Sequence, residues 1–495
     1  MNEIHLDKPA PGRGVMKLYL VSGLAVVGLL LLAGLAMRLS QGGWLPLPPD
    51  IFYSLLTLHG AGMIVAMMVC AMGAIWFLTR RQVKMSAPLA IAAWALIMVG
   101  VVGVLVATLV GRYGSLYTFL YPLPFRGNWP DWSTGVFLIG LVFVNAGWMI
   151  WCCQMLAGVL RAHGGYRGAL GWDYVWHSKS FEASGQHPPP PEAFPAFMVG
   201  LDGLIAGMAA TLLGVALVVR WIDPQVQIDP LWAKNLTYFW AHTVANLIIY
   251  MLAGVIYVAL PLVTRREYHI SKVFVVAWWV SMTLTLTNYF HHLYMDFAQP
   301  EILQYLGQLS SYLSALPVTV VTVFGALMLV WRSGMKWSLG ALFFYTGMLG
   351  WVVGGIGAEI DASVPFNVHL HNTLWVPAHF HTYLLGGCLL FVMGWVFLLL
   401  ESRSTTPTRS FTRWLISIPM FGGMLIFLLS FYVSGAYGVP RRYSIEPAPG
   451  PVLSQVASIG AAVMIVGMLL AALEGWRLWR SRSVQQTEIT EVIHG

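Results

Sequence analysis

The sequence predicts an all-α, polytopic membrane protein, and two observations predict it. Of the 495 residues, 58% are hydrophobic and only 9% are charged, which is too little polar material to cover a soluble globule. Stretches of about 20 apolar residues, the length that crosses a bilayer as a helix, recur twelve times. We therefore expect one domain over residues 1–495 with twelve transmembrane helices between about 16 and 478 and a cytoplasmic linker at about 162–194.

The predicted spans follow one another along the chain. Their bounds are about 16–38, 52–78, 86–111, 133–160, 195–221, 236–264, 270–295, 302–331, 337–356, 369–400, 411–433 and 451–478. The first has too long an apolar core for a cleaved signal peptide, and no small-residue cleavage site follows it. The linker contains Pro188 to Pro191 and predicts a polar, partly extended connection.

The basic residues indicate how the chain is oriented. With the N-terminus in the cytoplasm, 20 of the 27 Lys and Arg residues fall on inner loops and tails and seven on the outer side. Cytoplasmic loops are enriched in these residues. We expect both termini in the cytoplasm of a bacterial or archaeal inner membrane, surrounded by lipid. The net charge of +7 then reflects topology and does not indicate a nucleic-acid partner.

Histidines gather at one depth of this predicted bundle. Eight of the fourteen lie in its outer half: His59, His242, His291, His292, His369, His371, His379 and His381. A single membrane histidine is often a hydrogen-bonded packing residue, but eight at one level predict a redox metal site.

The spacing of these histidines predicts how they divide. His379 and His381 are two residues apart and point to nearly opposite faces of one helix, which can therefore serve two sites. His291 and His292 can both reach one metal, with His242 as the third ligand. Three neutral imidazoles suit copper, iron or zinc, so the ligand set leaves the metal open.

The segment from His371 to His381, with Trp375 and Pro377 inside it, resembles the tenth-helix motif of the haem-copper oxidase superfamily, catalytic subunit I. Its version is similar to that of the B-type oxygen reductases. Other motifs match in order over all twelve spans: His59 with Gly60, Trp240 with His242, His291 with His292, and the segment from Gly438 to Tyr443.

The resemblance implies two haems, one low-spin and one high-spin, and one non-haem metal, with copper favoured over iron. His59 and His381 would be axial ligands of the low-spin haem, and His379 the proximal ligand of the high-spin haem. The non-haem metal would be held by His242, His291 and His292. Haem propionates would pair with His371, Arg441 and Arg442.

One departure from the family bears on the substrate. The A-type and B-type oxygen reductases carry a redox tyrosine four residues after the helix-six histidine, where this chain has Asn246, and the C-type position is Thr285. Splitting dioxygen takes four electrons, whereas coupling two nitric oxide molecules takes two. The absence of this tyrosine favours reduction of nitric oxide to nitrous oxide, with Asn246 as a metal ligand or a hydrogen-bond donor. Common nitric oxide reductases have a glutamate there, so Asn246 departs from them too.

Two alternatives remain open at this stage. Tyr289, three residues before His292, lies on roughly the same helical face and is a candidate radical donor for cytochrome c oxidase-type reduction of oxygen to water, or an interfacial aromatic. A twelve-span transporter is the alternative of another class, although the sequence shows no two similar halves.

Electrons and protons need routes to such a site. The chain has neither a Cys-x-x-Cys-His motif nor a dinuclear copper motif, so we expect a separate electron-donating subunit, of dinuclear copper or cytochrome c type, on the outer face. Hydroxyl groups along two predicted helices suggest a proton path or simple packing: Ser311, Ser314, Thr319, Thr322, Tyr250 and Tyr257. Glu359 and Asp361 are expected on the outer side, as proton-transfer groups, cation ligands or part of a solvated loop.

Overall fold

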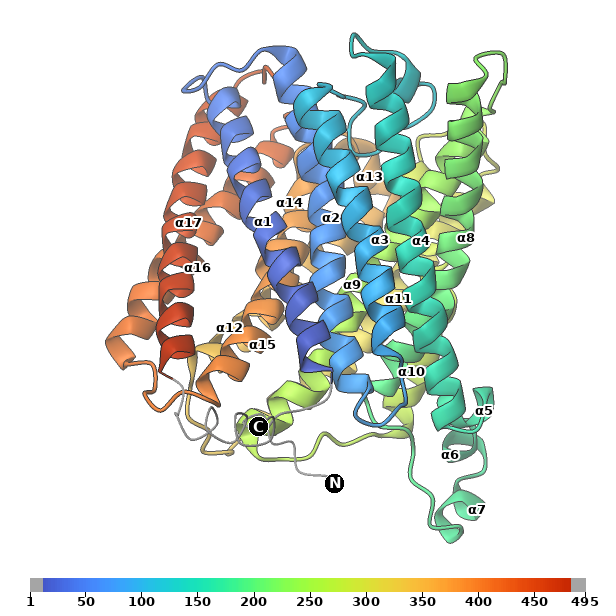
Figure 1. The fold of residues 1–495 in the computed structure, drawn as a ribbon, viewed down its shortest axis with the longest axis vertical. Coiled ribbons are helices and arrows are strands. Elements are labelled where there is room, and N and C mark those ends of the chain that lie inside the picture. Colours follow the sequence, from blue (N-terminus) through green and yellow to red (C-terminus); the bar gives the residue numbers. More distant parts are fainter. Residues whose placement is uncertain (1–11, 482–495) are drawn as a thin grey trace, which may run out of the picture.

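The computed structural model describes residues 12–481 as a bundle of long helices (Figure 1). It is 77% helical, and over the described residues the β structure consists of one bridge between Thr373 and Pro440. Within residues 12–481, eleven helices are long and apolar enough to cross a membrane. They are α1 (Arg13–Gln41), α2 (Pro49–Thr79), α3 (Ala87–Leu105) with its π-helical extension η1 (Val106–Val110), α4 (Asp131–Ala162), α8 (Ala193–Ile222), α9 (Pro230–Thr264), α11 (Ile302–Val330), α12 (Leu339–Ala362), the run of α14 (Trp375–His381), η4 (Thr382–Leu389) and α15 (Leu390–Glu401), α16 (Ser410–Ala436) and α17 (Gly450–Arg480). The all-α prediction is confirmed.

The seventh predicted span, 270–295, is not one continuous α-helix. The α-helix α10 (Lys272–Thr285) has 14 residues, and the 3₁₀-helix η3 (Asn288–Leu293) continues it. Asn288 donates a side-chain hydrogen bond to Ser314 Oγ of α11 at 3.0 Å, and such polar side chains compete with regular helix. Counting α10 and η3 together as one crossing gives twelve, which agrees with α1 beginning and α17 ending at the same end of the bundle (Figure 1). We call the end of the bundle where α1 begins and α17 ends the basic end. The opposite end, where the eight histidines are expected, is the histidine end.

Several helix starts follow directly from local sequence. Asp229 accepts a hydrogen bond from the Trp232 amide at 2.7 Å and starts α9, and Ser338 accepts one from Ala341 at 3.2 Å at the start of α12. Such caps satisfy amides that have no partner inside the helix. The side chains that later form the site are therefore held on helices whose ends are fixed.

Burial separates central from peripheral helices. Within the most apolar window of each span, 83% of the residues are buried in α9, 78% in the α14–α15 run and 72% in α2, against 28% in α3 and in α11. The three central spans carry His242, the pair His379 and His381, and His59 respectively. The predicted histidine site therefore lies in the interior of the bundle, away from lipid.

The predicted linker is more helical than expected. It contains α5 (Tyr166–Ala169), α6 (Trp172–Trp176) and α7 (Ser178–Ala183), which extend beyond the basic end of the bundle (Figure 1). Side chains hold it against the bundle: Tyr174 donates to the Ile270 carbonyl at 3.0 Å, and Trp279 donates to the Leu170 carbonyl at 2.8 Å. These contacts to neighbouring segments order a region that appeared polar and extended in sequence.

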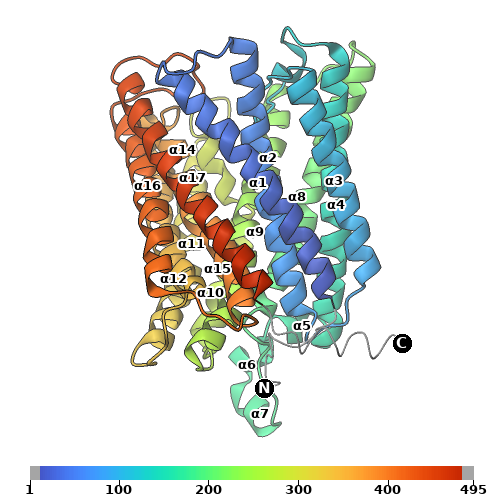
Figure 2. The same cartoon turned by 60° about the vertical axis from the view of Figure 1, so that its left-hand side comes forward.

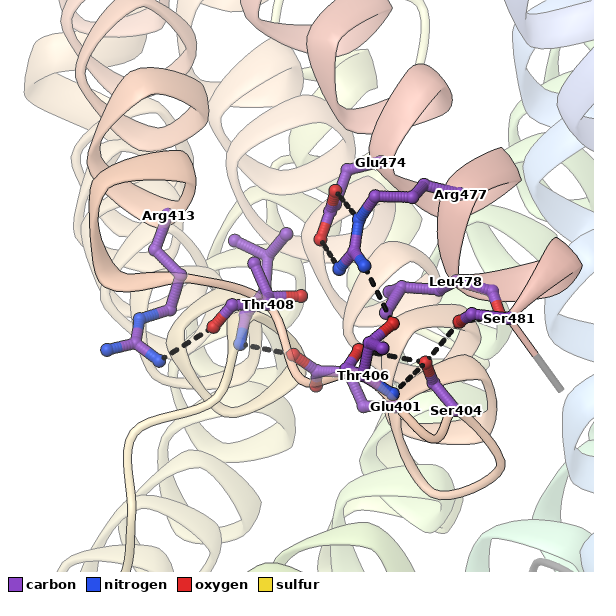
Figure 3. A network of polar contacts seen from close by, with 10 residues as sticks. Glu401, Ser404, Thr406, Thr408, Arg413, Glu474, Arg477, Leu478 and Ser481 are labelled. Carbon is purple, nitrogen blue, oxygen red and sulfur yellow. Dashed lines mark hydrogen bonds and ion pairs between the residues drawn. The ribbon is translucent and has the colours of Figure 1, made fainter. Parts of the chain in front are cut away.

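Helices α16 and α17 lie side by side at one edge of the bundle (Figure 2). At the basic end, the loop between α15 and α16 is fastened to α17 by a cluster of polar contacts (Figure 3). We call this the end cluster; its members include Glu401, Ser404, Thr406, Glu474, Arg477 and Ser481.

Candidate functional site

A cavity of ≈ 370 Å³ lies among the central helices. Six of the eight predicted histidines line it, together with both predicted arginines: His59, His242, His291, His292, His379, His381, Arg441 and Arg442. His369 is exposed on α13 (Val364–Leu370), a short helix separate from α14, and His371 follows that helix. The run from 369 to 381 is therefore split between two helices, and only its second half faces the cavity.

Three of these histidines form a compact group. The ring centroids of His242 and His291 are 4.7 Å apart, those of His242 and His292 are 4.9 Å apart, and those of His291 and His292 are 4.2 Å apart. One nitrogen from each ring lies within 4.8 Å of the others. The 3₁₀-helix η3 directs two successive side chains to one place, and His291 Nδ1 is fixed by Ser311 Oγ at 2.9 Å. The group can hold one metal ion through three imidazoles.

His59 and His381 form a second arrangement. Their rings are nearly parallel, 19° apart, with centroids 6.0 Å apart. Each Nδ1 is paired with a backbone carbonyl, His59 with Leu30 at 2.8 Å and His381 with Pro377 at 2.6 Å, which leaves both Nε2 atoms available to a metal. The pair therefore suits an iron ion bound by two imidazoles.

The backbone of α1 makes room beside His59. A Cβ atom on Gly34 would come within 2.8 Å of His59 Cε1, so glycine is needed for α1 to approach the ring this closely. On the other helix, the π-helix η4 begins directly after His381. π-Helical turns are frequent at functional sites, and this one directly follows α14, which carries two histidines that face the cavity.

Neither nitrogen of His379 has a hydrogen-bond partner within residues 12–481. The ring is buried, and its Nε2 lies 3.8 Å from Asp361 Oδ2. A buried nitrogen without a partner is unusual in a native interior. The ring is therefore suited to ligating a group that occupies the cavity.

The two arginines lie on the loop after α16, which runs beside the segment before α14. The Arg441 amide donates to the Asn372 carbonyl at 2.9 Å, and the Leu374 amide donates to the Val439 carbonyl at 2.9 Å. Neither guanidinium is ion-paired to a carboxylate among the described residues, and the Nε of each lacks a partner. Cations placed here fit an anionic group such as a haem propionate.

The same charges act on two loop side chains. Burial raises the pKa of Tyr117, but Arg442, 5.3 Å from the centre of its ring, and Arg441 together lower it to about 8. Burial, followed by the Arg441 charge, lowers the pKa of His371 to about 3. His371 is therefore neutral at physiological pH and can act toward a propionate as a hydrogen-bond donor only.

Asn246 reaches the metal-binding group, whereas Tyr289 does not. Asn246 Nδ2 donates to the His242 carbonyl at 3.0 Å and lies 3.3 Å from His242 Nδ1. The Tyr289 hydroxyl instead donates to Asn235 Oδ1 at 3.3 Å. The aromatic side chain beside the histidines is Tyr238, which stacks on His292 with ring centroids 5.0 Å apart and lines the cavity. Its position one turn before His242 was the available sequence signal.

Two charged groups were also placed differently by sequence reasoning. Glu359 and Asp361 lie on α12 and not on a solvated loop; Glu359 lines the cavity, and Asp361 is 2% exposed. Arg38 was not singled out from sequence. It is buried in an ion pair with Glu446 at 3.2 Å and stacks 4.2 Å over Phe431, whose ring is 5.3 Å from that of His381.

Comparison with known proteins agrees with this arrangement. Residues 14–470 match the family model described as cytochrome c and quinol oxidase polypeptide I. Cytochrome c oxidase subunit 1 of Thermus thermophilus is 25% identical over 456 residues, which are 86% of this chain and 75% of that protein. Cytochrome bo(3) ubiquinol oxidase subunit 1 of Buchnera aphidicola is 24% identical over 277 residues, 52% of this chain and 39% of that protein.

The fold matches as well. A cryo-EM structure of a haem-copper terminal oxidase dimer superposes with a TM-score of 0.75 and 19% identity, over 95% of this chain and 84% of that chain. The transporter alternative is wrong, because the matched family consists of oxidoreductases. The family resemblance expected from the ordered histidine motifs is confirmed. With its histidine-lined cavity and its match over residues 14–470, the chain belongs to the cytochrome c and quinol oxidase polypeptide I family, the catalytic subunit I of haem-copper oxidases.

Proposed function

We propose that this subunit reduces nitric oxide to nitrous oxide: two nitric oxide molecules, two electrons and two protons give one nitrous oxide and one water. Family membership implies haems and copper in a multi-pass inner-membrane protein. Reduction of nitric oxide is the finer assignment, and it is ours. The relatives named above are cytochrome c and quinol oxidases.

The observation that supports nitric oxide is the chemistry of position 246. Asn246 is one turn beyond His242 and is bonded to that residue, at the place where oxygen reductases of this superfamily carry a redox tyrosine. An amide has no accessible oxidised state, so it supplies no electron for cleaving dioxygen. Its Nδ2 can instead donate a hydrogen bond to a small polar molecule held between the metals. Thr285, the other family position for a tyrosine, is buried and also cannot be oxidised.

The proposed ligands follow the three arrangements described above. His59 and His381 would hold the low-spin haem, His379 the high-spin haem, and His242, His291 and His292 the non-haem metal, with copper preferred over iron. When bound, the high-spin haem and the non-haem metal would supply the two electrons and the coordination positions for the substrate. Arg441, Arg442 and His371 would anchor propionates and so fix the orientation of the haems.

Protons would enter from the basic end along side-chain hydroxyls. The Tyr257 hydroxyl lies 2.6 Å from Thr322 Oγ1. Further toward the histidines, Ser281 donates to the Tyr250 hydroxyl at 3.2 Å, and Asn288 donates to Ser314 Oγ at 3.0 Å. Ser311, bonded to His291, is the last hydroxyl before the metal-binding group. We propose that waters bridge the gaps between these hydrogen-bonded groups.

Electrons would arrive from a separate subunit of dinuclear copper or cytochrome c type at the histidine end, the end nearer to His59. The excess of Lys and Arg on the predicted inner loops and tails supports a cytoplasmic location for the basic end. The donor would then dock on the outer face, beside the loop that carries Arg441 and Arg442.

Oxygen reduction is the second candidate, and one contact favours it. Tyr238 stacks on His292, so a phenol does lie beside a proposed metal ligand, although at neither family position. In that case Tyr238 would supply the fourth electron that the metals lack. Tyr289, the phenol considered from sequence, has its hydroxyl bonded to Asn235 and is less suited to this role.

Turnover of one purified preparation with each gas tests the assignment. We expect nitrous oxide formation to exceed oxygen consumption. Asn246→Tyr should raise oxygen consumption by roughly tenfold, about 1.4 kcal/mol in the barrier, and Asn246→Phe, of the same size but without the phenol, should not. Dominant oxygen consumption by the wild type, abolished by Tyr238→Phe, would replace our proposal with the second candidate.

A further inference from the structure

We propose that Glu359 is the acid that delivers protons into the cavity during reduction. The Glu359 O–H bond breaks as its proton moves to the oxygen that leaves as water. The carboxylate then takes a new proton from the Tyr250 hydroxyl, which is supplied from the basic end. Two such cycles provide the two protons that the proposed reaction consumes. The inference rests on the proposed function in placing reduction in the cavity, and it adds a group that the hydroxyl series does not contain.

Glu359 is the only carboxylate among the described residues that line the cavity. Its Oε2 atom is buried and has no hydrogen-bond partner within residues 12–481. Ionisable groups inside a membrane are costly, and they mark proton relays and substrate paths. A carboxyl group is a stronger acid than the phenols and hydroxyls beside it, so it is the side chain best suited to hold a proton for release.

Helix register places Glu359 at the level of the hydroxyl series. The Val364 amide, just past the end of α12, donates to Gln308 Oε1 of α11 at 2.9 Å. The two helices run antiparallel, so moving five residues back from Val364 to Glu359 corresponds to moving five residues forward from Gln308 along α11. Glu359 is therefore level with the segment between Ser311 and Ser314, and both serines line the same cavity.

The hydroxyl groups of these two serines are already engaged. Ser311 Oγ donates to the Gly307 carbonyl at 2.6 Å, and Ser314 Oγ donates to the Ser311 carbonyl at 3.1 Å. Such bonds to the preceding turn are common for hydroxyls on helices. Each bond would have to break before its serine could pass a proton on, which favours a route that leaves the hydroxyl series earlier.

Tyr250 is the point from which such a route can leave. It accepts from Ser281 at 3.2 Å, and its own O–H donates only a 3.5 Å bond to the Ser314 carbonyl, which is long for a hydrogen bond. Tyr250 is also close enough to Glu359 for their charges to interact, and a water can bridge them. Asp202 of α8 is in range of Tyr250 as well but does not line the cavity.

Proton uptake by the fully reduced, haem-loaded complex tests this role. In one turnover with nitric oxide, a pH-indicator dye should show uptake slowed by about 100-fold in Glu359→Gln, as is typical for loss of a general acid. Haem spectra and carbon monoxide binding should stay as in the wild type. Glu359→Asp, which keeps an acid, should recover part of the rate. Glu474→Gln, a matched change of a buried carboxylate in the end cluster, should behave as the wild type.

Infrared spectroscopy gives a second readout, which a merely structural role would not move. Photolysis of carbon monoxide from the reduced complex should change the C=O stretching band of a protonated carboxyl group near the cavity. The band should be absent from Glu359→Gln and shifted in Glu359→Asp, and it should be unchanged in Glu474→Gln.

The outcomes separate the inference from the proposal beneath it. Wild-type proton uptake in Glu359→Gln would overturn the role of Glu359, and so would slow uptake accompanied by altered haem spectra. If Glu359→Gln failed to bind haem, an unshifted carboxyl band in Glu359→Asp would overturn it. Slow uptake with oxygen as well as with nitric oxide would support it, since either gas needs protons in the cavity. A wild-type preference for oxygen would overturn the nitric oxide assignment alone.

Discussion

Two regions of the molecule contain buried charged groups, and they treat those groups differently. In the end cluster (Figure 3), Glu474 is 6% exposed, and both of its carboxylate oxygens accept from Arg477, at 2.6 and 2.7 Å. Arg477 also donates to Thr406 at 2.8 Å. Glu401 accepts from the amides of Leu339 and Gly340 at the start of α12. Here the chain supplies a partner for each group.

At the histidine end, Arg38 is paired with Glu446, but several other polar groups have the opposite character. Polar atoms without partners gather around its cavity, from His379, Asp361, Glu359, Arg441 and Arg442. Native interiors leave few such atoms, and each one needs an explanation. The comparison indicates that the end cluster has a structural role and finds its partners within the protein. The polar groups around the cavity, by contrast, find theirs in bound groups. Variants in the two regions test this contrast, with expected effects from the loss of a whole haem to a small loss of stability.

The largest expected effect is on the low-spin haem. His381→Ala removes one of two proposed axial ligands, so the low-spin absorption signal should disappear and the haem content should fall from two to one. His369→Ala is the matched control, because that histidine lies at the same end but is exposed and outside the cavity. Retention of the low-spin signal in His381→Ala would contradict the pairing with His59.

The next effect is the loss of a single ion. His242→Ala removes one of three proposed ligands of the non-haem metal, so metal analysis should show that the ion is depleted while both haems remain bound. Turnover should fall by about 100-fold or more, since a ligand contributes at least as much as its supporting contacts. Loss of both haems in this variant would mean that His242 has a different role.

The smallest effect belongs to the end cluster. Arg477→Met leaves Glu474 buried without its cation, but because Arg477 is 43% exposed, solvent limits the loss to about 1–2 kcal/mol. We expect a slightly lower thermal unfolding temperature in detergent and unchanged haem spectra. Arg413→Met should cost less, because Arg413 donates only a 3.5 Å bond to the Thr408 carbonyl. Altered haem spectra in Arg477→Met would show that the two regions are coupled.

The sequence predicted where the chain crosses the membrane better than it predicted the backbone geometry and side-chain burial within each crossing. Runs of apolar residues locate the spans because length and hydropathy alone decide which segments cross a bilayer. The 3₁₀ geometry at His291 and His292 was not predictable, because it depends on Asn288 bonding to Ser314 of another helix. The burial of Asp361 was not predictable for a similar reason. The short helix α13 separates α12 from α14 in the chain, and an acidic pair before such a short segment is also typical of a solvated loop.

The sequence by itself determined the membrane class, the number of crossings and the set of histidines at one depth, since these depend on composition and on residue spacing along single helices. Only the tertiary structure decided which histidines share a cavity, that Tyr238 and not Tyr289 stacks on a proposed ligand, and that Asp361 faces His379. Those relations join helices far apart in the chain, and they are set by how closely the helices pack and by which side chains fill the space between them.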